Sequence, residues 1–192
     1  MHKIILTLVI LAIGTGSMKA QESNNSYFRT IPDHADKYTA GTVAARMIDG
    51  LGFRFYWATD SLREEDLNFR PGQEQRSIAE TIDHIYEMSF IILNTVIKEP
   101  LMPNEHLTYQ QKRETTLNNL QRISQLLVKS TDEDFATYNI TFGNGKEYPF
   151  WNMINGPIAD SLWHCGQIVS FRRSSGNPFN SNVSVFNGRL RN

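Results

Sequence analysis

The segment from Ala159 to Pro178, ADSLWHCGQIVSFRRSSGNP, brings several reactive side chains together in one predicted helix. Asp160 and His164 are four residues apart, so they share a helical face, with about 5–6 Å between their Cβ atoms. The single cysteine of the chain, Cys165, directly follows the histidine. These types and spacings allow a metal site, a thiol site or a helix that only packs.

A metal site on this face needs a third ligand from another helix. His84 is the candidate, because it lies between Ile82 and Ile85 in a second predicted helix, where a partly buried imidazole needs polar partners. Together with Asp160 and His164 it would supply two nitrogens and a carboxylate oxygen around a common cation in the bundle interior, with a fourth position open. Zinc best fits these donors, and nickel, iron or manganese would also be accepted.

A packing role explains the same residues. Asp160 and His164 can form an ion pair one helical turn apart, and His84 can be a hydrogen-bonded core residue. Cys165 is about 100° around the helix from His164, so we expect a packed thiol there. Gln167 lies one turn after His164 and would orient that ligand through a hydrogen bond.

For the other aromatic, glycine and arginine residues near this helix, the sequence predicts only burial or position. Trp57 and Trp163 are expected to be buried, or to line a pocket if they lie near the metal. Gly166 would permit a close contact between helices. Arg172 and Arg173 are expected at a helix C-terminus, where the dipole favours cations, and an anion-binding role is the alternative.

Two further histidines, His34 and His106, fall in predicted loops and are expected at the surface. Glu80 and Glu87 share the predicted helix of His84. Each glutamate is either a hydrogen-bond partner of the metal ligands or a surface charge.

Apolar periodicity predicts four helices that must position these side chains. Ser77 and Glu80 form a capping box that starts the second helix, Thr108 caps the third, and Pro157 interrupts or restarts the last. The helices are expected over residues 42 to 62–65, 77–97, 108–129 and 157–174. Their inward positions are expected to include Ile78, Ile82, Ile85, Met88, Ile92 and Val96 of the second helix and Leu117, Leu120, Ile123, Leu127 and Val128 of the third.

The connections are long. Residues 67–77 read as a loop with a Pro-Gly turn, and Pro100 and Pro103 prevent helix in the next connection. Between 132 and 150 an alternating apolar pattern around Asn144-Gly145 predicts either a small hairpin or a structured loop. The fold class that follows is all-α, a four-helix bundle with a small hairpin as an option before the last helix.

Two stretches resemble the DinB-like (DinB/YfiT) superfamily. RPGQEQRSIAETIDHIYE (70–87) is similar to the entry into its second helix, and HCGQIVSFRRSSGNP (164–178) is similar to its final helix. The resemblance covers most of the chain after Thr42. It implies a four-helix bundle, often a homodimer, that commonly binds a divalent metal at the places of His84, Asp160 and His164. The commoner family residue at position 160 is histidine, so the aspartate leaves metal identity and affinity open.

The first residues have the pattern of a secretory signal peptide, with a basic start, a short apolar run from Ile4 to Ile13, and cleavage after Ala20. The predicted organisation is a leader at 1–20, an extension at 21–41, the bundle at 42–178 and a C-terminal tail at 179–192. The leader implies export, to a periplasm or the outside, and a mature chain of about 172 residues without a membrane span. An exported chain with one cysteine forms no internal disulfide.

Composition and resemblance together leave three functional hypotheses. The formal charge is −1, or −3 without the two lysines of residues 1–20, and no basic stripe points to nucleic acid. The first hypothesis is an enzyme, either a metal-dependent thiol S-transferase as in related family members, or a hydrolase with metal-activated water, on an unknown small substrate. The others are a non-catalytic metal- or ligand-binding protein of envelope stress, and a bundle whose histidines are structural.

Overall fold

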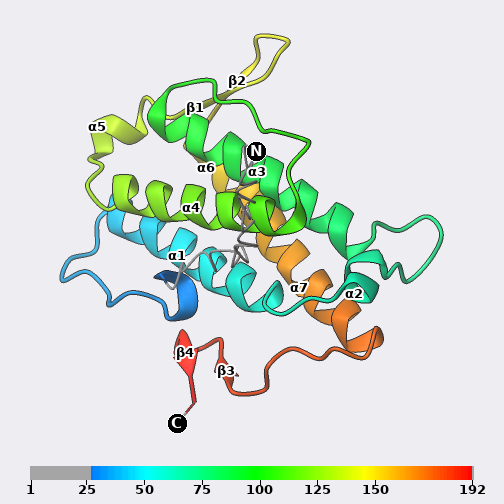
Figure 1. The fold of residues 1–192 in the computed structure, drawn as a ribbon. Helices are drawn as coiled ribbons and strands as arrows, with labels where there is room; N and C mark the ends of the chain where they lie inside the picture. The colour runs from blue at the N-terminus through cyan, green and yellow to red at the C-terminus, as the bar shows by residue number, and fades with distance from the viewer. Residues whose placement is uncertain (1–26, 192) are drawn as a thin grey trace, which may run out of the picture.

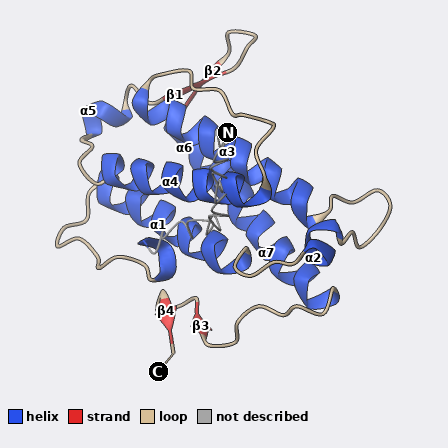
Figure 2. Cartoon of the chain, in the orientation of Figure 1, coloured by secondary structure: helices blue, strands red, loops and turns tan. Residues whose placement is uncertain are grey.

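The computed structural model describes residues 27–191 of the 192-residue chain. The predicted leader at residues 1–20 lies outside this range. The described chain is mostly helical, with four short strands in two hairpins (Figure 2). In residues 27–191, no helix combines the length and apolar character needed to cross a membrane.

Four long helices form a bundle (Figure 1): α1 (Ala40–Ala58), α3 (Ile78–Ile97), α4 (Tyr109–Leu127) and α7 (Ala159–Ser174). Both α1 and α3 pack against α4 on one side and α7 on the other. The mostly helical class predicted from periodicity is therefore confirmed. The face between α3 and α7 brings together residues more than 70 positions apart in the sequence.

Capping interactions explain where the middle helices begin. Ser77 Oγ accepts a hydrogen bond from the backbone of Glu80, and the Glu80 carboxylate accepts one from the backbone of Ser77. Thr108 and Gln111 form the same reciprocal pair before α4. Each box satisfies backbone donors that the first helical turn leaves free, and both starts agree with the sequence prediction.

The first helix ends earlier than predicted. It stops at Ala58 instead of at 62–65, and a separate helix α2 (Glu64–Asn68) occupies part of the predicted loop. Ser61 between them has φ 54°, a left-handed conformation that interrupts a helix. The buried guanidinium of Arg172 on α7 also donates to the last carbonyl groups of α1, at Trp57 and Ala58, so these groups are satisfied without another helical turn.

The apolar stripes predicted for α3 and α4 form the core almost completely. Met88 is only partly buried, and Val128 is 43% exposed. The prediction for Val128 was wrong because this residue follows the last residue of α4. The predicted positions that lie in the main core are Ile78, Ile82, Ile85, Ile92, Val96, Leu117, Leu120, Ile123 and Leu127.

The segment before the last helix is a hairpin, so the structured-loop alternative is excluded. After the short helix α5 (Asp132–Phe135), β1 (Asn139–Thr141) pairs antiparallel with β2 (Glu147–Pro149), and Ile140 faces Tyr148. Gly145 has φ 77° in the connecting turn, a conformation that glycine adopts without strain.

The chain is interrupted around Pro157, as predicted, before the last helix begins at Ala159. Helix α6 (Phe150–Met153) leads into a π-helical segment, η2 (Ile154–Ile158), in which Gly156 has non-helical φ and ψ values of −93° and −107°. Proline lacks the backbone donor needed to continue a regular helix. Regular helix resumes at Ala159, which places Asp160 in the first turn of α7.

Both ends of the described chain pack beside α1. The short 3₁₀ helix η1 (Tyr27–Arg29) carries the buried Phe28. At the other end, β3 (Val183–Ser184) and β4 (Arg189–Leu190) form a hairpin within the predicted tail. Val183 packs there with Phe53 and Trp57 of α1 in a second, smaller apolar cluster.

Candidate metal centre

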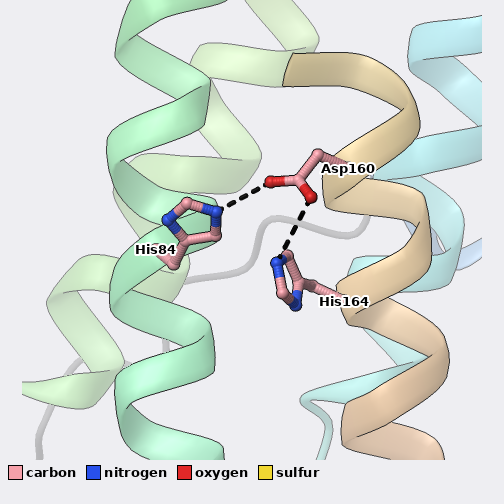
Figure 3. Close-up of side chains that lie close together, drawn as sticks. All are labelled: His84, Asp160 and His164. Atoms are coloured by element: carbon pink, nitrogen blue, oxygen red, sulfur yellow. Dashed lines mark hydrogen bonds and ion pairs between the residues drawn. The ribbon is translucent and has the colours of Figure 1, made fainter. Parts of the chain in front are cut away.

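The three predicted metal ligands converge between α3 and α7. Figure 3 shows His84 reaching across from α3 to Asp160 and His164, which project from successive turns of α7. One ligand atom from each side chain lies within 4.8 Å of the other two. The cluster could therefore hold a metal ion, as its spacing on α7 and the position of His84 on α3 predicted.

Asp160 is the central member of the cluster. Its Oδ2 lies 2.7 Å from Nε2 of His84, and its Oδ1 lies 3.4 Å from Nε2 of His164 (Figure 3). The two imidazole rings meet edge to face, with centroids 4.8 Å apart. One carboxylate thus faces an imidazole nitrogen on each side, and all three groups border the same small space.

The cluster lies at the edge of the bundle and not in its interior. The side chains of His84, Asp160 and His164 are 20%, 41% and 13% exposed. The expectation of a buried cation in the core is corrected accordingly, because α7 turns this face toward the seam with α3. Asp160 is the most exposed of the three ligands.

The proton on His164 is fixed by Gln167. Nδ1 of His164 lies 2.7 Å from Oε1 of Gln167, the contact predicted from their spacing. An amide oxygen only accepts hydrogen bonds, so Nδ1 carries the ring proton. In the neutral ring Nε2 then presents a lone pair toward Asp160 Oδ1. A cation or a second proton is needed to turn this repulsive contact into an attractive one.

His84 and Asp160 can also interact without a metal. At 2.7 Å, Nε2–H of His84 donates a hydrogen bond to the carboxylate. This bond links α3 to α7 directly. The packing alternative predicted an ion pair between Asp160 and His164, whereas the shorter contact of Asp160 is with His84, at 2.7 Å against 3.4 Å. A structural role would therefore be a histidine–carboxylate bridge between two helices, built from the same side chains as the metal site.

The restart of α7 positions the carboxylate. Ser161 Oγ donates to the carbonyl oxygen of Pro157, across the first turn of the resumed helix. Asp160 occupies this first turn, where the partial positive charge of a helix N-terminus favours an anionic side chain. His164 follows one turn later on the same face, so the kink at Pro157 sets the direction of both ligands.

The neighbouring thiol has no part in the cluster. Cys165 is 2% exposed, and burial raises its pKa to about 12. A thiol in this state is protonated and shielded, and it does not act as a nucleophile at neutral pH. The prediction of a packed thiol is confirmed.

The other predicted surface groups are exposed as expected. His34, His106 and Glu87 all lie at the surface. Glu80 is occupied by an ion pair with Arg70, 2.8 Å away, and by its capping box with Ser77, which together lower its pKa to about 2. It is not a hydrogen-bond partner of the metal ligands.

Two expectations for α7 were wrong, those for Trp163 and Gly166. Trp163 is 72% exposed, whereas Trp57 is buried as expected. Gly166 allows no close helix contact, because an added Cβ would meet no atom within 4 Å. Arg172 and Arg173 lie in the last turn of α7, as predicted, and Arg172 is buried at 3% exposure, which lowers its pKa. Residue type and spacing alone did not reveal which side of α7 packs against α1.

No family model matches this chain, and no curated protein matches its sequence.

Proposed function

We propose that this protein binds one divalent metal ion, zinc foremost, through His84, Asp160 and His164. The observation that carries the proposal is the convergence of their ligand atoms within 4.8 Å, from two helices that meet only in the folded bundle. Imidazole nitrogen and carboxylate oxygen are both donors that zinc accepts, and nickel, iron and manganese are the alternatives.

Two features support a metal over a simple ion pair. Gln167 holds the proton of His164 on Nδ1, the arrangement found for metal-ligating histidines whose other nitrogen is free to coordinate. The carboxylate of Asp160 stays 41% exposed, so the site has an open side instead of a closed, dry bridge.

We further propose that the bundle is of the DinB type. The support is the order in which the resembling stretches occur, together with the place of each ligand. One histidine is on the second long helix, and the carboxylate–histidine pair is on the last, as the resemblance implies. Asp160 makes the donor set more oxygen-rich than the common family pattern and favours harder ions relative to it.

The proposed activity is activation of a nucleophile. With three protein ligands, a bound ion would keep a position for a water or a thiol and lower its pKa. Cys165 is buried, so any thiol would come from a second substrate. The proposed export leader would place the site where small cytosolic thiols are scarce, which favours hydrolysis over thiol transfer. The exposed edge at Asp160 would admit the substrate.

Metal binding is tested by titrating the chelator-stripped, untagged protein with zinc and measuring stoichiometry by elemental analysis. We expect about one zinc per chain. His84→Ala and His164→Ala should each weaken binding by more than the roughly 10–100-fold typical of losing a supporting residue. His106→Ala removes an exposed histidine away from the cluster and should bind like the wild type.

Loss of binding in the His106 variant as well, or no zinc, nickel or manganese in the wild type, would reject the metal site and leave the helix-bridging role.

A second experiment separates a catalytic metal site from a non-catalytic one. The metal-loaded protein is screened for ester, amide and phosphoester hydrolysis and for thiol conjugation, with His164→Ala as the control. Metal binding without turnover in any assay favours the non-catalytic ligand-binding alternative.

A further inference from the structure

Two residues next to the candidate metal centre are unfavourable choices for an ordinary exposed helix face. Trp163 leaves 72% of its surface in solvent, which forgoes the stabilisation that burial of an indole provides. Gly166, in the middle of the same helix, is exposed and destabilises it relative to alanine. No backbone or side-chain neighbour among the described residues requires a glycine there.

Trp163 is a close neighbour of Asp160, the most exposed ligand, along α7. Trp163 follows Asp160 by three residues, so the two are neighbours on the surface of α7. Long side chains on a helix lean toward its N-terminus, over the preceding turn. From this rule we expect the indole of Trp163 to extend over the turn that carries Asp160, the most exposed of the three ligands.

The glycine keeps one side of the indole free. A side chain at position 166, three residues after Trp163, would lean back over the tryptophan in the same way. Gly166 has none, and a Cβ there would face open space. Position 166 therefore supplies no side chain that could cover the C-terminal side of Trp163, and the glycine lowers the stability of the helix. Local choices that disfavour the fold tend to occur where function requires them.

We infer that Trp163 forms the wall of a substrate subsite and selects small molecules that carry a planar aromatic group next to a metal-binding head. This inference rests on the proposed metal site. The head, a carboxylate, hydroxamate or similar anion, would enter beside Asp160, while its ring stacks on the indole. Offset or edge-to-face contact with an indole stabilises an aromatic ring beyond simple burial.

The test compares two probes with the same metal-binding head, benzohydroxamate and acetohydroxamate, on the zinc-loaded full chain by calorimetry. In wild type we expect benzohydroxamate to bind more tightly. Trp163→Ala should weaken benzohydroxamate about tenfold and change acetohydroxamate by less than about twofold. Trp163→Phe, which restores a ring, should recover most of the difference.

Trp151 provides the matched control, because it is 75% exposed but lies on α6, which carries none of the three ligands. Trp151→Ala should leave both probes unchanged. The inference is overturned if Trp163→Ala affects the two hydroxamates equally, or if Trp151→Ala has the same selective effect. Failure of the proposed metal site is seen separately, as absence of zinc from the protein before any probe is added.

Discussion

At the scale of single residues, the amide of Gln167 decides which nitrogen of His164 is free. Gln167→Leu keeps the side-chain size but removes the acceptor for Nδ1–H. The ring can then adopt the other tautomer or rotate. We expect zinc affinity to fall by about 10–100-fold, as for other residues that support a ligand. Competition with a chromogenic chelator measures this change.

Two variants of α7 make that result specific. Gln167→Glu retains an acceptor for the same hydrogen bond and should bind zinc at least as well as the wild type. Ser170→Ala alters an exposed residue on the same helix and should have no effect. Unchanged zinc affinity in Gln167→Leu would mean that His164 is held without the amide.

The sequence was most informative about contacts along one helix. Asp160, His164 and Gln167 are linked by spacings of three and four residues, so their contacts follow from helix geometry alone. His84 was a candidate because of its place among apolar residues of the second helix, and the resemblance strengthened it, since its distance in sequence from Asp160 carries no geometric signal. The exposure of Trp163 could not be predicted, since it depends on which helices cover α7.

At the scale of elements, a buried carboxylate joins α2 to the end of α7. Asp66 is fully buried and accepts hydrogen bonds from the Arg63 guanidinium, from Ser175 Oγ and from the Asn177 amide. Asn177 also donates to the carbonyl oxygen of Ser61. This network gives a structural role to the asparagine of the Gly-Asn-Pro ending that contributed to the family resemblance.

Asp66→Asn tests this junction. The hydrogen bonds, first of all that of Arg63, hold the pKa of Asp66 far below its ordinary value. Replacing the charge should lower the free energy of unfolding by about 1–3 kcal/mol at pH 7, because it weakens several hydrogen bonds to a buried carboxylate, although the Arg63 side chain is half exposed. Urea unfolding measures the difference, and Asp36→Asn, at an exposed aspartate, should change stability by less than about 0.5 kcal/mol.

The same carboxylate predicts a pH dependence. A depressed pKa in the folded state stabilises the protein above the ordinary aspartate pKa of about 3.9, and this contribution is lost as pH falls below it. Unfolding measured from pH 6 to pH 2.5 should therefore show the gap between wild type and Asp66→Asn narrowing as pH falls. A gap that stays constant, or widens toward acid, contradicts the assigned role of the charge.

Helix beginnings were predictable, whereas one helix end was not. The Ser77–Glu80 box is a local pattern, readable from residues three apart. The end of α1 depends instead on Arg172, which is more than 110 positions away and donates to its last carbonyl groups. From the sequence, a basic residue near the end of one helix gives no sign that its guanidinium donates hydrogen bonds to the carbonyl groups of another helix.

At the scale of the whole molecule, the two ends of the described chain are far apart in the sequence but lie side by side against α1. The backbone N–H of Ile31 donates to the carbonyl oxygen of Gly188 at 2.7 Å. Gly188 has φ 65°, and a Cβ there would lie 2.7 Å from the Ile31 side chain. This contact helps place the β3–β4 hairpin beside α1, so the predicted tail contributes to the fold.

Val183→Asp tests whether the hairpin stabilises the whole bundle. Val183 is 5% exposed against Phe53 and Trp57, so a carboxylate there would be buried without a partner or would detach the hairpin. If the hairpin detaches, the loss of stability cannot exceed the free energy with which the hairpin packs on α1. We therefore expect the free energy of unfolding to fall by about 2–3 kcal/mol. Val185→Asp, at a position that is 40% exposed, should be nearly neutral. Zinc affinity should not change in either variant, because the three ligands lie on α3 and α7 while Val183 packs against α1.

Two results would contradict these expectations. Equal stability of Val183→Asp and Val185→Asp would show that the hairpin packs on the bundle without stabilising it. A loss of zinc affinity in Val183→Asp would show that the metal centre depends on the packing of α1.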